Sequence, residues 1–190
     1  MAAIIMSVTA LVDFYEKTGG DNWKVKLNWM EHPNYCLWYG ITCDSKFNVV
    51  AIKIPGNNLI GTIPASLRSL DHLSALILPN NKIASIHPDA FQDKAFCTVD
   101  LTKNKLTEIP TCLTTAFGLF GFNKISSVPT GQISNIEMSC NKLTGKVDHT
   151  KFLTSDFTCN AVDCQDVLPH GHSCGNLVCG PCDIFQGKPK

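Results

Sequence analysis

The sequence predicts an α/β solenoid, in which similar turns of chain stack in a right-handed coil around one parallel β-sheet on the concave face. Three observations lead to this fold class. Six segments of the 190-residue chain share one apolar pattern, an asparagine stands at the same place in each, and no segment can bury its apolar face alone. We divide the chain into an N-terminal cap (1–48), six repeats (49–162) and a cysteine-rich C-terminal cap with a short tail (163–190).

The repeats show the alternation of a strand with one buried face. With the first residue of each aligned segment counted as position 1, apolar residues fall mostly at positions 1, 4, 6 and 11. The aligned segments are 49–59, 73–83, 96–106, 115–125, 133–143 and 152–162. Positions 4 and 6 supply the expected core pairs Ile52/Ile54, Leu76/Leu78, Val99/Leu101 and Ile136/Met138.

Position 9 is asparagine in every turn, and we expect these residues to form a ladder. Just past the strand the chain turns inward, which leaves backbone N–H and C=O groups without partners in the sheet. An amide side chain both donates and accepts hydrogen bonds, so it can satisfy both kinds of group. The ladder residues are Asn57, Asn81, Asn104, Asn123, Asn141 and Asn160.

The return segments between strands shorten along the chain. Successive ladder asparagines are separated by 24, 23, 19, 18 and 19 residues. Early turns therefore have room for short helical segments, at 65–70 and 89–93, whereas later turns must return in tight loops. Gly118 and Ser155 occupy position 4, where the pattern favours a large apolar residue, so we expect the fourth and sixth turns to be less regular.

The segment before the repeats is expected to open with an amphipathic helix that closes at Gly19-Gly20, because Leu11, Phe14 and Tyr15 have helical spacing. Together with the first repeat it carries a family resemblance. NNLIGTIPASLRSL at 57–70 and CLWYGITC at 36–43 resemble the plant-type leucine-rich repeats of extracellular receptors and inhibitors, and the cap that precedes them. The resemblance implies a disulfide between Cys36 and Cys43, tryptophans that cover the first turn, and a recognition role without naming a ligand.

Cysteines outside this cap leave several pairings open. Cys140 and Cys159 share position 8 of consecutive turns and could pair with each other or with the tail, and Cys97 could pair with Cys112. The tail favours an oxidised cap over a zinc site or a CxxC redox centre. The residues that could supply zinc ligands are His170, His172, Cys174, Cys179 and Cys182.

Composition narrows the function. Sixteen basic and sixteen acidic residues cancel, so nothing favours nucleic acid or an anionic membrane as partner, and no run approaches the ~20 apolar residues of a membrane span. The apolar start at 1–12 does not match a signal peptide, and ten cysteines favour an oxidising, extracellular or cell-surface location. The scattered histidines match no catalytic motif, so we expect no enzyme activity and no cofactor.

The favoured function is recognition of a protein or glycan partner on the concave face, where position 5 points away from the core. The rival is a structural component that self-associates, and the oligomeric state is left open. Large apolar residues at positions 3, 5 and 8 of the fourth turn predict an exposed patch beside an acidic strip. A one-residue slip of that turn would instead bury Phe117 and Leu119 and expose Phe120. The predicted contact residues are Lys53, Ile77, Asp100, Phe117, Leu119, Phe122, Glu137 and Asp156.

Overall fold

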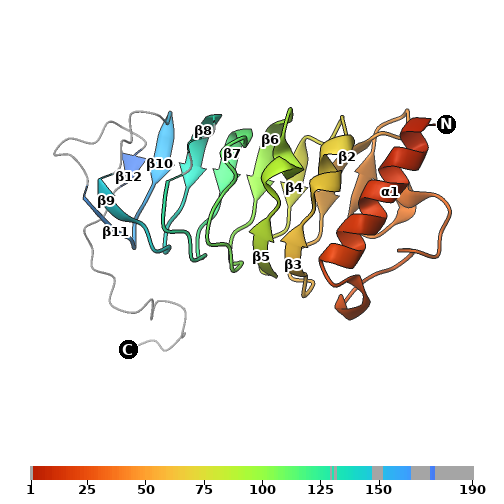
Figure 1. Ribbon diagram of the computed structural model, residues 1–190, viewed down its shortest axis with the longest axis horizontal. Helices are drawn as coiled ribbons and strands as arrows, with labels where there is room; N and C mark the ends of the chain where they lie inside the picture. The colour runs from red at the N-terminus through yellow and green to blue at the C-terminus, as the bar shows by residue number, and fades with distance from the viewer. Residues whose placement is uncertain (1, 129, 131, 147–151, 164–171, 174–190) are drawn as a thin grey trace.

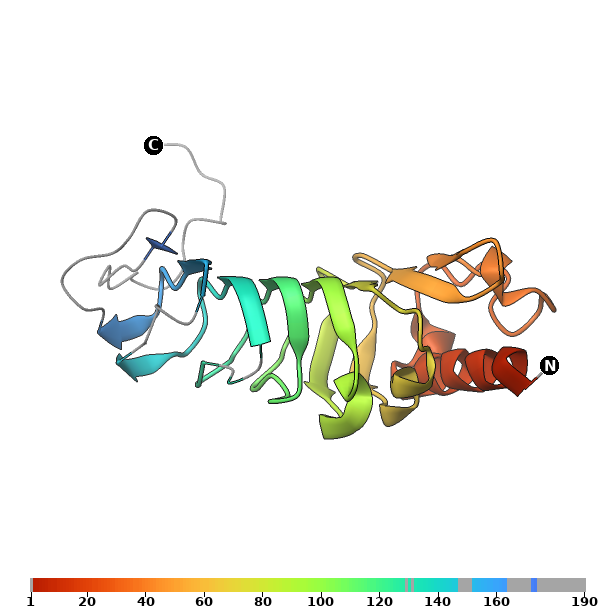
Figure 2. The ribbon, with the colours of Figure 1, turned by 90° about the horizontal axis from the view of Figure 1, so that it is seen from above.

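The chain folds into an elongated solenoid whose strands line one side, as the sequence predicts (Figure 1). The computed structural model describes residues 2–128, 130, 132–146, 152–163 and 172–173. The C-terminal cap and its cysteines lie outside the described residues, apart from Asp163 and the two-residue strand His172–Ser173. The N-terminal helix and the strands of the last repeat lie at opposite ends of the described molecule (Figures 1 and 2).

One sheet of eight strands runs the length of the solenoid, in the order β1-β2-β4-β6-β7-β8-β10-β12. β1 is antiparallel to β2, and every later pair is parallel. Each aligned repeat supplies one strand, and a final short strand follows the last repeat. The strands are β1 (Ile41–Cys43), β2 (Val49–Lys53), β4 (Ala75–Ile77), β6 (Ala95–Asp100), β7 (Thr114–Leu119), β8 (Gln132–Glu137), β10 (Thr154–Asp156) and β12 (His172–Ser173).

The core is built from the alternating residues of these strands. Ile52, Leu76 and Val99 at position 4 are fully buried, as are the position 6 residues. Leu59, Ile83, Leu106 and Ile125 at position 11 close the core on the return side. Each turn therefore adds one layer of apolar side chains, and burial of that layer against its neighbours stabilises the stack.

The asparagines connect the turns through backbone hydrogen bonds. The Asn104 side chain is representative, because its amide donates to Leu78 O at 2.9 Å and Leu101 O at 3.0 Å, while its oxygen accepts from Ile83 N at 3.0 Å. Each ladder amide after the first repeats this bridge to the preceding turn, and Asn57 makes it to Val25 of the cap. No buried side-chain nitrogen or oxygen in the described part of the chain lacks a hydrogen-bond partner.

Position 8, directly before the asparagine, is left-handed in all six turns, a feature that the sequence analysis did not anticipate. Its φ angles lie between 51° and 60°. Only two of the six residues, glycine and asparagine, adopt this conformation readily. The turn that aims the asparagine inward imposes it on the other four side chains as well. The residues are Gly56, Asn80, Lys103, Phe122, Cys140 and Cys159.

Two small parallel sheets lie beyond the ladder, on the second side of the coil. β3 (Ile60–Ile63) pairs with β5 (Lys82–Ile86), and β9 (Thr144–Lys146) pairs with β11 (Ala161–Asp163). Gly61 and Gly145 both have φ near 80°, and a Cβ on Gly61 would lie 2.5 Å from Lys17 O. Sequence analysis missed these sheets, although the LxGxI and LTG patterns coincide with them.

Short 3₁₀ helices return the early turns, where the sequence predicts helical segments. They are η3 (Ala65–Ser69) and η4 (Pro88–Phe91). Leu67, Ala90 and Phe91 are fully buried, so these helices cover the core opposite the main sheet.

The N-terminal cap is a helix followed by an aromatic cluster. The helix α1 (Ala2–Lys17) ends before Gly19, whose φ is 69°, close to the end that the sequence predicts. Trp29 lies at the centre of the cluster, 4.9 Å from Trp23 and 4.8 Å from Trp38 between ring centroids. All three tryptophans are buried over the first turn, as expected.

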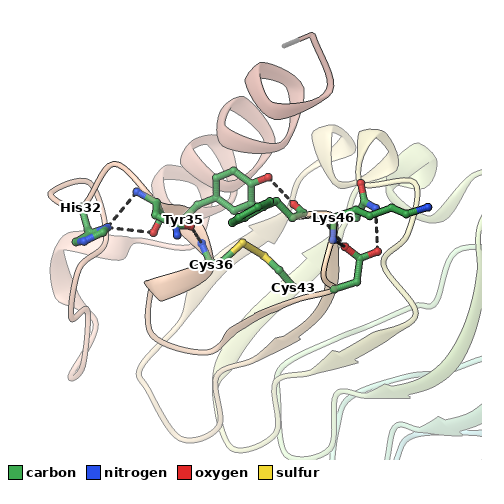
Figure 3. The surroundings of a disulfide bond; sticks show 9 residues. His32, Tyr35, Cys36, Cys43 and Lys46 are labelled. Atoms are coloured by element: carbon green, nitrogen blue, oxygen red, sulfur yellow. Dashed lines mark hydrogen bonds between the residues drawn. A yellow bond between two sulfur atoms is a disulfide. The ribbon is translucent and has the colours of Figure 1, made fainter.

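A disulfide joins Cys36 and Cys43, as the resemblance implies (Figure 3). Cys36 belongs to the 3₁₀ helix η2 (Tyr35–Leu37), and Cys43 ends β1. The Tyr35 hydroxyl donates to Phe47 O at 2.6 Å, which ties the same helix to the loop before β2. A second 3₁₀ helix, η1 (Gly20–Asn22), links α1 to this region.

The other proposed cysteine pairs have different outcomes. Cys97 and Cys112 are free thiols, which makes that pairing wrong, and the Cys112 thiol donates to Pro88 O at 3.1 Å. Pairing of Cys140, Cys159 and the tail cysteines stays a prediction, because the tail lies outside the described residues.

Candidate functional site on the concave face

The residues at position 5 form one continuous row across the concave face. In the sheet register, Lys53 pairs with Ile77, Ile77 with Asp100, and the row continues through the later strands. Lys53 is exposed, and the other five are partly exposed. The row is basic at its N-terminal end and acidic towards its C-terminal end, and it ends with Leu119, Glu137 and Asp156 on adjacent strands.

The fourth turn places apolar side chains at the middle of this face. Phe117 is 52% exposed, and Leu119 is half-buried beside it on β7. Phe122 contributes less than the sequence analysis indicates. It is half-buried, and the Lys103 ammonium lies 5.5 Å from its ring centroid. The exposed patch therefore consists of Phe117 and Leu119, with Phe122 at its edge.

The slipped register of the fourth turn is wrong. Gly118 pairs with Val99 and Ile136, each at position 4, and Phe120 is fully buried. A Cβ on Gly118 would lie 2.7 Å from the Phe120 ring and 3.2 Å from Ile133 Cγ2. The Phe120 ring thus fills the space that a large residue at position 4 would occupy, and β7 is as regular as its neighbours.

The sixth turn keeps the register of its neighbours despite the small residue at position 4. Its strand β10 spans three residues, as does β4, which has Leu76 at that position. Ser155 is buried and stays in register with Ile136.

The acidic residues of the row have structural contacts that the sequence analysis missed. Asp100, Glu137 and Asp156 each accept a hydrogen bond from the backbone N–H two residues later, at 2.8–3.0 Å. Glu137 also accepts from Gly121 N at 3.2 Å, and a Cβ on Gly121 would lie 2.5 Å from that carboxylate. Each carboxylate keeps further lone pairs, because an ionised carboxyl offers about four acceptor sites.

A hollow of about 240 Å³ lies over β7, β8 and β10. The Phe117 and Leu119 side chains form its apolar wall, and Glu137 and Asp156 form its acidic wall. Within the described residues, neither carboxylate has a lysine, arginine or histidine nitrogen within ion-pair distance. The hollow therefore combines exposed apolar area with carboxylates that form no ion pair within the described part of the chain. The residues that complete its lining are Asn135, Ile136, Thr154 and Ser155.

Two further sequence predictions, on a membrane span and on a metal site, concern the described part of the chain. No helix there is long and apolar enough to cross a membrane. No three histidine, cysteine or acidic side chains gather there as a metal site would require. The zinc ligands considered for the tail lie outside the described residues, except for the backbone of His172.

Curated relatives of the chain are plant receptors. No protein-family profile matches it. It is 39% identical to Receptor-like protein 3 of Arabidopsis thaliana over 67 residues, or 34% of this chain and 9% of that relative. It is 25% identical to Receptor-like protein kinase BRI1-like 3 of the same plant over 160 residues, or 76% of this chain and 13% of the relative. The chain therefore matches a small part of these relatives.

Solved structures with the same fold are ectodomains from Arabidopsis thaliana. The ectodomain of GASSHO1/SCHENGEN3 is 22% identical with a TM-score of 0.66, covering 82% of this chain and 21% of that one. A chain of the BIR3–SERK2 complex is 20% identical with a TM-score of 0.60, covering 89% and 99%. The fold and its disulfide cap define a leucine-rich-repeat solenoid. The sequence relatives are plant receptor-like proteins and receptor-like kinases, each of which this chain matches over a small part of its length.

Proposed function

We propose that the chain is a non-enzymatic recognition module that binds a protein partner on its concave face, outside the cell or at its surface. The observation that carries the proposal is the hollow on β7, β8 and β10. Phe117 projects there with half of its surface in solvent, beside carboxylates without a cationic partner in the described chain. Exposed apolar area of this kind, with a polar surround, is typical of interaction sites.

Similar proteins support the same function. The GASSHO1/SCHENGEN3 ectodomain was solved with CASPARIAN STRIP INTEGRITY FACTOR 2, and another neighbour is described as a BIR3–SERK2 complex. The Cys36–Cys43 disulfide supports an oxidising, extracellular setting. These likenesses favour a protein over a glycan as the partner.

The chemistry of the hollow indicates what the partner segment contributes. An apolar side chain would bury area against Phe117 and Leu119, and a lysine or arginine would pair with Glu137 and Asp156. Burial of the apolar group supplies most of the affinity, and the charge pair adds specificity and a faster encounter. Both parts lie on adjacent strands, so a short segment can reach them together.

A binding screen with a matched variant tests the proposal. Purified chain would be screened against secreted proteins of its source organism and against a glycan array, and the dissociation constant of each ligand measured by calorimetry. We expect Phe117→Asp to raise the dissociation constant of the specific ligand by more than about tenfold. The melting temperature should stay unchanged, since Phe117 is exposed. Phe47→Asp is the control, because Phe47 is 54% exposed in the cap.

Other outcomes count against the proposal. A ligand that binds Phe117→Asp and the wild type equally well would place recognition elsewhere. If the screen found a ligand among the glycans and none among the proteins, the partner would be a glycan and the proposal of a protein partner would be wrong.

A further inference from the structure

Lysine occupies one position of the repeat in four consecutive turns. Position 10, directly after the ladder asparagine, is lysine in the second to fifth turns. The segments that begin there read KIASI, KLTEI, KISSV and KLTGK, so they hold five lysines and one acidic residue, Glu108. The charges of the whole chain cancel, but basic residues predominate on this side of the solenoid. The lysine row consists of Lys82, Lys105, Lys124 and Lys142.

Backbone hydrogen bonds hold the lysine row in one stack. Each lysine N–H donates to the carbonyl of the position 11 residue in the preceding turn, at 2.7 Å for Lys82 and 2.8 Å for the other three. Strands joined by such bonds lie about 5 Å apart, and the Debye length at physiological salt is about 8 Å. The positive potentials of neighbouring lysines therefore add. The segments that begin at these lysines follow one edge of the solenoid, from β5 to β9 (Figure 1).

The side chains of the lysine row point to solvent among hydroxyl groups. All four lysines are exposed, and the position 11 residue that follows each of them is buried. Position 12 is exposed again, and it carries a hydroxyl in Thr107, Ser126 and Thr144. The backbone bonds to the preceding turn place Lys124 beside Thr107 and Lys142 beside Ser126. Amines and hydroxyls therefore alternate on this surface.

The amines of the row are available to a ligand. In the part of the chain that the structure describes, no carboxylate lies within ion-pair distance of any of the four. Lys82 donates to Asn58 Oδ1 at 2.7 Å, which uses one of the three donors of its ammonium group. The remaining donors can bind the oxygens of an anion, and such charge-assisted hydrogen bonds are stronger than neutral ones.

The surroundings of the row indicate the class of ligand. Protein–protein interfaces draw most of their affinity from a few large side chains, often aromatic, in buried pockets. Among the described residues at positions 10 and 12, Ile60 alone is a large apolar side chain exposed to solvent, and it belongs to the turn before the row. Amines beside hydroxyls instead match a ligand in which every unit carries a carboxylate and hydroxyl groups.

We propose that the lysine row binds a linear acidic polysaccharide, with one carboxylate on each sugar, laid along the solenoid axis over the second to fifth turns. The four lysines span about 15 Å along that axis, so several sugars contact the row together. The carboxylates accept hydrogen bonds from the amines, and the sugar hydroxyls bond with Thr107 and Ser126. This site lies across the asparagine ladder from the concave face, and it does not depend on the protein partner proposed above.

Calorimetry with fragments of a polyuronate tests the proposal. We expect the affinity of the wild type to rise with fragment length until a fragment spans the four lysines, and then to level. It should fall as salt is added, because exposed charges are screened. The methyl ester of the same fragment keeps the sugars and removes the charge. Its dissociation constant should be more than about tenfold higher.

Paired lysine variants locate the site. A lysine near an anionic surface contributes about fivefold in affinity, so Lys105→Gln with Lys124→Gln should raise the dissociation constant more than about tenfold. Arginine at both positions should keep the affinity, because the charge remains. Lys26→Gln with Lys46→Gln is the control, since it removes the same net charge from the cap. All four lysines are exposed, so the melting temperatures should not change.

The opposite results would overturn the proposal. Equal binding of the fragment and its methyl ester, or an equal loss in the two glutamine pairs, would mean that the row does not bind the carboxylates. If poly-glutamate of equal charge bound the row more tightly than the polyuronate, the ligand would be an acidic peptide and not a polysaccharide. Phe117→Asp should bind the polyuronate like the wild type, so this proposal and the concave-face proposal can fail separately.

Discussion

Replacing Asn104 tests whether the asparagine ladder holds the turns together. Asn104 is buried, and its side chain makes three hydrogen bonds of 2.9–3.0 Å to Leu78 O, Leu101 O and Ile83 N. Asn104→Ala removes all three. Leu78 O still accepts from the Asn81 amide and Leu101 O from the Asn123 amide, so the Ile83 N–H is the group left without a partner. Asn104→Asp keeps an acceptor for Ile83 N but turns a carboxylate towards two carbonyl oxygens.

The expected loss follows from counting those groups. A hydrogen bond contributes about 1 kcal/mol net, and a buried group left without a partner costs about 1–3 kcal/mol. Relaxation and water entry reduce the sum, so we expect Asn104→Ala to lower the free energy of unfolding by about 3 kcal/mol. Asn104→Asp should cost at least as much, because burial of an unpaired charge adds to the loss of both donors.

Two probes of urea unfolding make the measurement specific. All three tryptophans lie in the N-terminal cap, so their fluorescence reports on the cap, while far-UV circular dichroism reports on the whole sheet. Loss of a ladder residue in the third turn should shift the circular dichroism transition at least as much as the fluorescence transition.

Asn135→Ala provides the control. The Asn135 side chain also makes two hydrogen bonds, to Ala116 O and from the Thr154 hydroxyl, but on the exposed concave face where water can replace them. Asn135→Ala should lower the free energy of unfolding by less than about 1 kcal/mol. If Asn104→Ala cost no more than Asn135→Ala, the ladder would not stabilise the stack in the way argued here.

Three further predictions concern the core, the cap and a buried amine. Gly118→Leu, which restores the apolar pattern, should destabilise the fold by about 1–3 kcal/mol because Phe120 already fills the space, and Phe120→Leu in the same chain should recover part of the loss in thermal melts. Replacing Cys36 and Cys43 together by alanine should cost about 2–3 kcal/mol, as expected for a short closed loop, and an unchanged tryptophan transition in urea would contradict this. Burial lowers the pKa of Lys94 below its ordinary 10.5, so between the folded and unfolded pKa values the unfolded state binds more protons and stability rises with pH. The unfolding free energy of the wild type relative to Lys94→Met should therefore increase as the pH rises towards 10.5, and a flat difference would contradict the lowered pKa.

The repeat pattern was sufficient to predict the solenoid. The alternation of apolar residues indicates a strand with one buried face, and the recurring asparagine indicates a turn whose backbone groups need hydrogen-bond partners. Ile52, Leu76 and Val99 are buried where their spacing places them. The left-handed position 8 was harder to recognise. Gly56 and Asn80 signal it in the first two turns, but lysine, phenylalanine and cysteine stand there later.

The register of the fourth turn and the contacts of the acidic row depend on packing that the sequence pattern alone does not show. Gly118 considered by itself favours a one-residue slip of the fourth turn, because it leaves position 4 without a side chain. The Phe120 ring at position 6 fills that space, so no slip is needed. The backbone contacts of Asp100, Glu137 and Asp156 could not be read from charge alone, since they depend on the turn that follows each strand. The predicted row therefore lies on one face of the sheet in continuous register, and its contact with a partner stays a prediction.

The two small sheets connect different turns of the solenoid. β3 pairs with β5 on the second side of the first two turns, and β9 pairs with β11 on the second side of the last two. Within the described residues, the third and fourth turns have no such sheet and are joined by the main sheet and the ladder. The main sheet is most extensive at these middle turns, because β7 pairs with β6 and with β8 over five positions each, against three for β2 with β4. A partner seated at Phe117 would therefore contact the turn that the main sheet holds over its longest strands.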